Sequence, residues 1–169
     1  PYTTLFRSMV FDTSQEQPIY RWGSNPQAFD NFGLLVQKRD RNGEIDIPFN
    51  NYGEVRVETG RIRLEEGGTS TTGRFVVPHG TRLEFHGGTH TLGENTVVTG
   101  AGEVRASAGR AIIRSTYEHS GPVTINGGRI DYDVDVTLSS INQTSGDLGG
   151  SGAVTVADYS VTDGEIQPG

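Results

Sequence analysis

The stretch Gly53-Glu54-Val55-Arg56-Val57-Glu58-Thr59-Gly60-Arg61-Ile62-Arg63-Leu64 decides the fold. In it, apolar residues alternate with charged ones before and after a turn that contains Gly60. Because successive side chains of a β-strand point to opposite faces, the apolar residues share one face: Val55, Val57, Ile62 and Leu64. The charged residues between them then face water. The stretch therefore predicts two short strands and a tight corner, where Gly tolerates a positive φ.

The same pattern recurs along the chain. Further copies start at Gly73, Gly102 and Gly121, and a half copy starts at Gly152. One such unit cannot bury its apolar face alone, but stacked units cover one another. Two strands and two turns in about 20 residues would make one coil of a solenoid. The repeats thus predict an all-β chain folded as a β-solenoid.

An antiparallel β-sandwich is the alternative architecture, because it also has short strands at regular spacing. The recurring Gly offsets favour the solenoid. The composition agrees with either all-β fold: the chain has 24 Gly, and its Thr (18) and Val (15) outnumber its Leu (8) and Ala (7). Ala and Leu favour helices, whereas Val and Thr favour strands.

Composition also excludes several classes of function. The chain has no Cys, which excludes disulfides, thiol chemistry and Cys-ligated metals. Its net charge is −7 and it contains one Lys, so it lacks the basic surface that nucleic acid requires. No apolar run approaches the ~20 residues of a membrane-spanning helix, so no such segment is expected.

Several stretches resemble the Gly/Thr/Val-rich repeats of large bacterial surface proteins, in the style of autotransporter passengers and filamentous-haemagglutinin-like adhesins. They are residues 51–64, 73–85, 87–92, 100–104 and 149–156. The resemblance implies a right-handed parallel β-helix, secretion to the cell surface, and a structural or adhesive role without catalysis or cofactor. Surface glycans or other cell-surface proteins are the partners that it implies. The chain departs from these repeats in being richer in Arg, Glu and Asp.

The chain divides into three parts. Residues 1–8 resemble a translated sequencing adapter, and we expect them to be non-native. Residues 9–48 do not fit the repeat, and Asn42-Gly43 between two apolar runs predicts a hairpin. Trp22, Phe29 and Phe32 predict either one irregular coil outside the solenoid or a cap over the open end of the stack. Residues 49–169 form the repeat region, which we expect to be a monomeric, truncated segment of a longer array.

Asp131, Asp133 and Asp135 are the strongest candidates for a site. A period of two would place all three carboxylates on one strand face. Such a face suits a divalent-ion site, a calcium- or glycan-binding module, or the acids of a carbohydrate-active β-helix enzyme resembling polysaccharide lyases. Catalysis would also need a groove and a base such as Arg129 or Arg114. A solvated outer face is the simpler interpretation, so we assign no catalytic, cofactor-binding or metal-binding residue.

Three weaker patterns are interpreted as structural. Residues 38–49 partly match the spacing of a calcium loop, but Lys38 and Phe49 occupy two of the ligand positions, so a turn is predicted. His86 and His90 are predicted at turns or on the surface. Residues 146–152 are Gly-rich but precede a strand instead of a helix, which predicts a turn and not a phosphate site.

Overall fold

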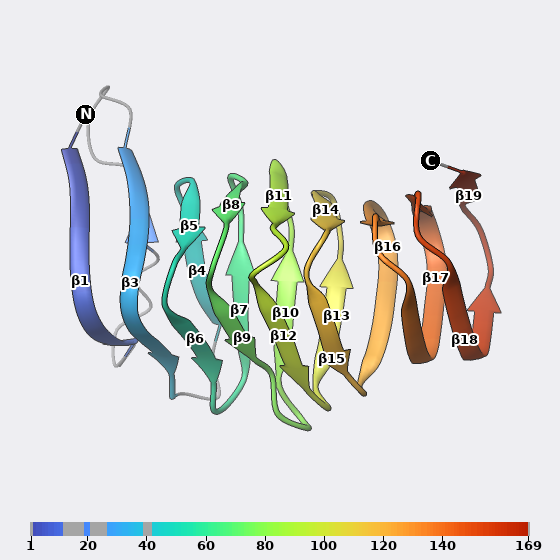
Figure 1. Ribbon diagram of the computed structural model, residues 1–169, viewed down its shortest axis with the longest axis horizontal. Helices are drawn as coiled ribbons and strands as arrows, with labels where there is room; N and C mark the ends of the chain where they lie inside the picture. The colour runs from blue at the N-terminus through green and yellow to red at the C-terminus, as the bar shows by residue number, and fades with distance from the viewer. Residues whose placement is uncertain (1, 12–18, 21–26, 39–41, 169) are drawn as a thin grey trace.

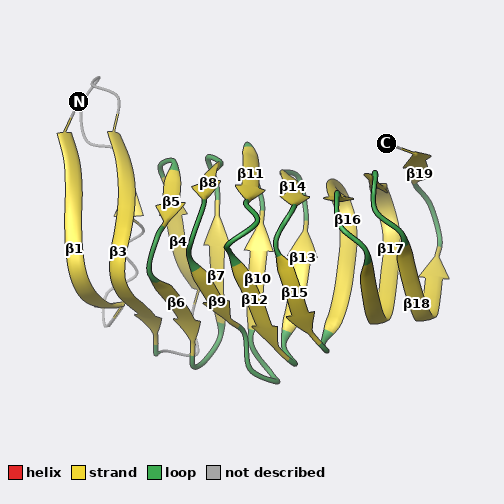
Figure 2. Cartoon of the chain, viewed as in Figure 1, coloured by secondary structure: helices red, strands yellow, loops and turns green. Residues whose placement is uncertain are grey.

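The structure is a computed structural model that describes residues 2–11, 19–20, 27–38 and 42–168. These residues form β-strands and no helix, and the strands stack as a β-solenoid of about seven turns. The chain advances along the long axis of the molecule while its strands run across that axis (Figure 1). Loops occupy only the corners between strands (Figure 2). Every strand pair in the described part is parallel, which confirms the predicted solenoid and rules out the sandwich.

The strands lie on three sides of the stack. The first side contains the second half of β3 (Gln27–Gln37), β6 (Glu54–Val57), β9 (Arg74–Val76), β12 (Val97–Gly100) and β15 (Thr116–His119). The second side contains β2 (Ile19–Tyr20), β4 (Asn42–Asp46), β7 (Arg61–Leu64), β10 (Arg82–Phe85), β13 (Glu103–Ala106) and the first half of β16 (Pro122–Tyr132). The third side contains β5 (Phe49–Asn51), β8 (Gly68–Ser70), β11 (Thr89–Leu92), β14 (Arg110–Ile113) and the second half of β16.

Four further strands extend the stack at its two ends. β1 (Tyr2–Phe11) pairs along β3 at the N-terminal end. At the C-terminal end, β17 (Val136–Gly150) pairs with β16, and β18 (Val154–Val161) and β19 (Glu165–Pro168) pair with β17. The register there advances by 18 residues in each coil, as between Asp147 and Glu165.

The predicted coil of two strands is wrong, because each coil contains three. β6 and β7 are the two strands of the sequence template, and β8 is the third. β8 reads Gly-Thr-Ser and has no alternating apolar pattern, so its sequence did not reveal it. The copies of the repeated sequence pattern also do not all lie on the same side of the stack. The copies at Gly53 and Gly73 lead into the first side, whereas those at Gly102 and Gly121 lead into the second, which explains their uneven spacing.

The core lies between the three sides and runs through the whole stack. The four residues predicted to point inward are at most 1% exposed: Val55, Val57, Ile62 and Leu64. Leu83 pairs in register with Ile62 of the preceding coil and with Val104 of the following one. Each coil therefore buries its apolar side chains against its neighbours, and stability depends on contacts between coils.

The glycines that start each template copy are explained by close contact between coils. The predicted positive φ occurs at the second glycine of the first two copies, Gly60 (φ 65°) and Gly80 (φ 81°), but not at Gly109 or Gly128 of the later copies, nor at the first glycine of any copy. A Cβ at Gly121 would lie 1.8 Å from the carbonyl oxygen of Gly102, and one at Gly53 would lie 2.1 Å from that of Gly33. Successive coils thus touch backbone to backbone at these corners, and only Gly fits.

The predicted hairpin in residues 9–48 is wrong. β3 pairs with β6 on the first side and β4 pairs with β7 on the second, and both pairings are parallel. The Asn42-Gly43 signal marks a strand start here, because Gly43 lies in register with Ile62 inside the stack. Trp22 and Asp40, which the sequence assigned to a cap and a turn, lie outside the described residues. The non-native origin of residues 1–8 stays a prediction.

Buried amides hold the corner between the third and first sides. Asn31 and Asn51 are in register and fully buried, and Asn31 Nδ2 donates to Asn51 Oδ1 at 2.7 Å. The same two side chains donate to the carbonyl oxygens of Glu54 and Arg74, at 3.1 and 3.2 Å. The side-chain amides thereby provide hydrogen bonds inside the core for backbone carbonyl groups at the corner.

Candidate functional site

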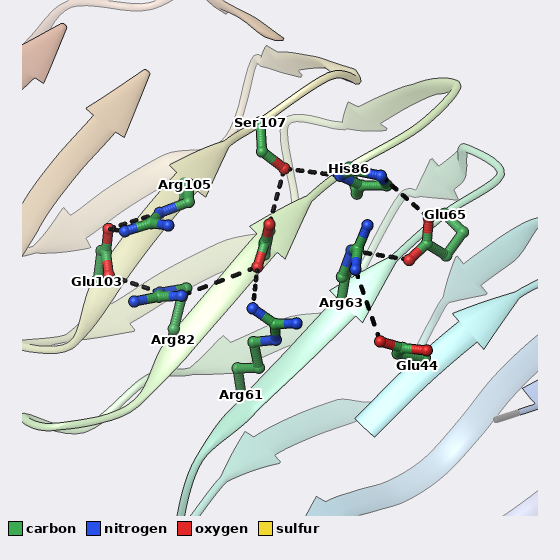
Figure 3. Close-up of polar contacts among 10 residues, drawn as sticks. Glu44, Arg61, Arg63, Glu65, Arg82, His86, Glu103, Arg105 and Ser107 are labelled. Atoms are coloured by element: carbon green, nitrogen blue, oxygen red, sulfur yellow. Dashed lines mark hydrogen bonds and ion pairs between the residues drawn. The ribbon is translucent and has the colours of Figure 1, made fainter. Parts of the chain in front are cut away.

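The densest group of polar side chains lies on the outer face of the second side. We call this group the charged face (Figure 3). Its members come from β4, β7, β10 and β13 and the residues that follow the last three of these strands. They are Glu44, Arg61, Arg63, Glu65, Arg82, Glu84, His86, Glu103, Arg105 and Ser107. The alternation that buries Ile62 and Leu64 directs Arg61 and Arg63 outward, as predicted.

The register of the coils places opposite charges side by side. One row across the strands reads Glu44, Arg63, Glu84, Arg105. Arg63 Nη1 lies 3.6 Å from Glu44 Oε1, and Arg61 Nη1 lies 3.3 Å from Glu84 Oε2. Since neighbouring strands are about 4.8 Å apart, charges on adjacent coils are within contact distance. The rows therefore link each coil to the next.

Glu103 is the most heavily bonded carboxylate of the charged face. Arg82 Nε lies 2.6 Å from its Oε2, and Arg105 Nη2 lies 2.7 Å from its Oε1. Burial acts to raise the pKa of Glu103, but hydrogen bonds from Thr124, Arg105 and Arg82 outweigh it and hold the pKa below its ordinary value. Glu103 is thus an ionised structural anchor for Arg82.

A Ser–His–Glu arrangement lies at one edge of the charged face. Ser107 Oγ is 2.9 Å from His86 Nδ1, and His86 Nε2 is 3.7 Å from Glu65 Oε2. The Ser107 hydroxyl donates to Glu84 Oε1 at 2.7 Å. His86 then donates to Ser107 and cannot also take its proton, so this hydroxyl is not activated as a nucleophile. The arrangement is a hydrogen-bonded chain that joins three coils.

Sequence spacing did not reveal this arrangement. Glu65, His86 and Ser107 are 21 residues apart in each step, and only the coil register brings them together. The predicted position at a turn or on the surface holds for His86, which follows β10 and is partly exposed, but is wrong for His90, which lies inside β11 (Thr89–Leu92). His90 is 3% exposed, and its Nε2 lies 2.9 Å from the carbonyl oxygen of Gly87. Burial lowers the pKa of His90 to about 4.

A polar pocket opens at the corner between the first and second sides. We call it the corner groove. Its volume is about 460 Å³. The first outward residues of successive strands form much of its lining: Asn42, Arg61, Arg82, Glu103 and Pro122. His79, Gly80 and Thr81 also line it, and they belong to the connection from β9 to β10. That connection spans residues 77–81, two residues more than residues 58–60 between β6 and β7.

The three aspartates of the predicted site do not form one face. β16 ends at Tyr132, so the period-two alternation stops there and Asp133 and Asp135 lie in the following corner. Asp133 Oδ2 accepts from Arg114 Nε at 2.9 Å, and Asp135 Oδ1 accepts from the backbone N–H of Ala153 at 2.8 Å. None of the three aspartates lines the corner groove. Within the described residues no group of three or more His, Asp or Glu side chains could hold a metal ion.

Asp131 instead joins two coils of the third side. It is 2% exposed, and its carboxylate lies 2.5 Å from Arg110 Nε and 2.7 Å from Arg129 Nη2. Burial acts to raise the pKa of Asp131, but hydrogen bonds from Arg129 and Arg110 outweigh it and lower the pKa. Arg129 also donates to Gln167 and approaches Asp147. The predicted acid and base of an enzyme thus neutralise each other in a structural contact.

Asp131→Asn should destabilise the stack by about 2 kcal/mol, because two guanidinium groups lose their shared anion while the side-chain shape is kept. The estimate is reduced from the value for a buried pair because Arg110 is 48% exposed. Urea unfolding followed by circular dichroism measures the change. Asp133→Asn is the matched control: the Asp133 side chain is 25% exposed against 3% for Asp131 and pairs with one arginine instead of two, so the loss should be about 0.5 kcal/mol or less. Equal losses would contradict the assigned role of Asp131.

The Gly-rich segment 146–152 is built into the stack. Residues 146–150 end β17, and residues 151–152 form the corner before β18, so part of the predicted turn is strand.

The described part of the chain contains no helix that is long and apolar enough to cross a membrane. Comparison of the chain with known protein families, curated proteins and solved structures finds no match.

Proposed function

We propose that the chain is a non-catalytic structural segment of a secreted bacterial cell-surface protein, acting as a stiff spacer with an adhesive outer face. One observation carries the proposal. The second side is a continuous parallel sheet from β4 through β7, β10, β13, β16 and β17 to β18. Bending the stack would break backbone hydrogen bonds between neighbouring coils. A rod of this kind is suited to holding other parts of a protein at a fixed distance.

The interior and the charged face support stiffness independently. Buried Asn31 and Asn51 join coils through the corner, and the ion pairs of Arg61 with Glu84 and of Arg82 with Glu103 join coils across the outer face. A coil that rotated against its neighbour would expose apolar side chains and separate these partners at once. Because the backbone pairing of the second side continues across each coil boundary from β4 to β18, none of these boundaries is an obvious hinge.

The enzyme alternative receives less support from the same residues. Asp131 is held by Arg110 and Arg129, and the Ser107 hydroxyl already donates to Glu84. Neither arrangement leaves an acid or nucleophile directed at a substrate. The location at the cell surface rests on the resemblance of residues 51–64 and 73–85 to surface-protein repeats.

Pulsed electron paramagnetic resonance of paired spin labels tests the spacer proposal. The chain has no Cys, so Thr59→Cys and Ser160→Cys would label two exposed sites several coils apart and nowhere else. We expect one narrow distance distribution. The pair Thr59→Cys and Glu66→Cys lies within one coil and measures the spread of the labels themselves. A markedly broader distribution for the long pair than for the short pair would contradict the spacer proposal.

A further inference from the structure

The floor of the corner groove is a row of polar side chains aligned with the long axis of the stack. Asn42, Arg61, Arg82 and Glu103 occupy the same register position on four neighbouring strands. At about 4.8 Å per strand, the row from Asn42 to Glu103 is about 14 Å long. A ligand in this groove would therefore lie along the axis and cross several coils.

Arg61 is the residue in the groove with unused hydrogen-bond donors. Its guanidinium has one ion-pair contact, from Nη1 to Glu84 Oε2 at 3.3 Å, and its Nε is buried, so only the Nη groups can face a ligand. Glu84 is itself only 5% exposed and accepts from Ser107, so it holds Arg61 from behind the groove. Arg82 differs, because its Nε already donates to Glu103. Arg61 can thus offer N–H groups of its terminal Nη atoms to an anion.

The charge of the groove favours an anion although the whole chain is acidic. Two arginines line it against one glutamate, Glu103, whose carboxylate is already bound by Arg82 and Arg105. The lining thus carries one positive charge in excess in a chain whose net charge is −7, and Glu84 behind the groove partly offsets it. Planar guanidinium groups match carboxylate and sulfate oxygens, which accept two parallel hydrogen bonds.

The lining also limits the kind of molecule that carries the anion. It contains no aromatic ring apart from the imidazole of His79, and its largest apolar residue is Pro122. An apolar peptide side chain would therefore find no pocket to fill. A hydroxylated chain would find hydrogen-bonding partners in Asn42 and Arg82 of the row and in His79 of the wall beside it. These features together describe a site for an extended, acidic saccharide.

We propose that the corner groove binds an acidic oligosaccharide along the axis of the solenoid, with Arg61 pairing to a carboxylate or sulfate group of the sugar chain. Glu84 is a positioning residue for Arg61, and His79 with Gly80 forms part of the wall. This proposal names the class of ligand that the adhesive outer face would bind, and it therefore rests on the adhesive role proposed above. The spin-label experiment measures stiffness and the binding experiment measures the groove, so either can fail alone.

Titration calorimetry with defined saccharides tests the proposal. The probes are a hyaluronan oligosaccharide, its carboxyl-reduced form and a dextran sulfate oligosaccharide, which separate carboxylate, uncharged chain and sulfate. We expect at least one acidic probe to bind and the carboxyl-reduced form to bind at least tenfold more weakly than its parent if the carboxylate is the bound group. Added salt should weaken binding, since the contact is ionic and partly exposed.

Variants then locate the site. Arg61→Gln should weaken binding of the acidic probe about tenfold, the loss expected for one charge-assisted contact. Asn42→Asp should weaken binding by a similar factor, because it adds a negative charge at an exposed groove residue and serves as a second test if Arg61→Gln folds poorly. Arg114→Gln is the matched control, since Arg114 pairs with Asp133 and does not line the groove.

Four results would overturn the proposal, and the first three concern the probes and the groove variants. They are the absence of binding by either acidic probe at millimolar concentration, equal binding by the parent protein and both groove variants, and equal binding of a polyglutamate peptide. The last result would show an anion site without preference for a saccharide. Tight binding of the acidic probe that Arg114→Gln reduces as much as Arg61→Gln would also overturn it, because general surface charge would then explain the affinity.

Discussion

Gly121→Ala should destabilise the solenoid by about 3 kcal/mol or more, and the variant should unfold at a much lower urea concentration than the parent. The added Cβ would lie 1.8 Å from the carbonyl oxygen of Gly102 and 2.7 Å from the carbonyl carbon of Ala101. Both atoms belong to the backbone of the preceding coil, so neither can rotate away. The two coils would have to separate locally, and the strands that follow the corner would lose register.

Gly80→Ala separates this packing effect from the conformational freedom of glycine. Gly80 has φ +81°, but a Cβ there would have no heavy atom within 4 Å. Its substitution should cost about 1 kcal/mol, the strain of an L-residue in a left-handed conformation. Urea unfolding of both variants gives the comparison. A loss for Gly121→Ala no greater than that for Gly80→Ala would refute close packing between coils as the reason for the repeated glycines.

Acid should destabilise the protein strongly because two histidines are buried in the neutral form. Burial lowers the pKa values of His90 and His119 to about 4 each. In the unfolded chain both titrate near pH 6.5, so the unfolded state binds protons first as the pH falls. Stability is therefore complete above about pH 6.5 and decreases as the pH falls towards about 4. Each histidine accounts for about 3 kcal/mol of this decrease.

Urea unfolding at pH 7.5 and pH 4.5 measures the decrease. The double variant His90→Gln/His119→Gln should show a much smaller difference between the two pH values, whatever its stability at pH 7.5. His79→Gln, at an exposed position, should keep the pH dependence of the parent. Nuclear magnetic resonance titration of the parent histidines gives a second reading. If both buried imidazoles titrated near pH 6.5 in the folded protein, the expected acid sensitivity would be wrong.

Protonation of Asp131 causes a second loss of stability, at lower pH than the histidines. The pKa of Asp131 is lowered in the folded state, chiefly because hydrogen bonds from Arg129 and Arg110 outweigh the effect of burial. Its contribution is present above the ordinary pKa of an aspartate and is lost as the pH falls through the lower folded value. The histidine step and the aspartate step therefore act in the same direction but in successive pH ranges.

The alternation of apolar and charged residues predicted the strands well, because the side of a strand on which a residue lies depends only on its position relative to its neighbours in sequence. Ile62 and Leu64 are two residues apart and are buried together, as expected from a strand. The third strand of the coil was missed because Gly68, Thr69 and Ser70 carry no apolar alternation. Their position is determined by the strands before and after them in the stack, and that information is absent from the local sequence.

The candidate site was harder to predict for a related reason. Arg61 and Glu84 meet although 23 residues separate them, because Glu84 lies two residues beyond Arg82, the in-register partner of Arg61 on the next coil. The register offset between coils also differs along the chain. Leu34 pairs with Glu54 after 20 residues, Leu83 with Val104 after 21, and Asp147 with Glu165 after 18. A single period therefore does not align the whole sequence. For Asp131, Asp133 and Asp135, local spacing misled because the strand ended inside the pattern.

The row Glu44, Arg63, Glu84, Arg105 has a consequence for how such an array can change in length. Its charges alternate in sign from one coil to the next. Removing one coil, such as the one that carries Arg63, would place Glu44 beside Glu84, and like charges on adjacent strands repel. Removing two coils would keep the alternation. This segment of the solenoid therefore has a parity: it tolerates gain or loss of coils in pairs better than singly.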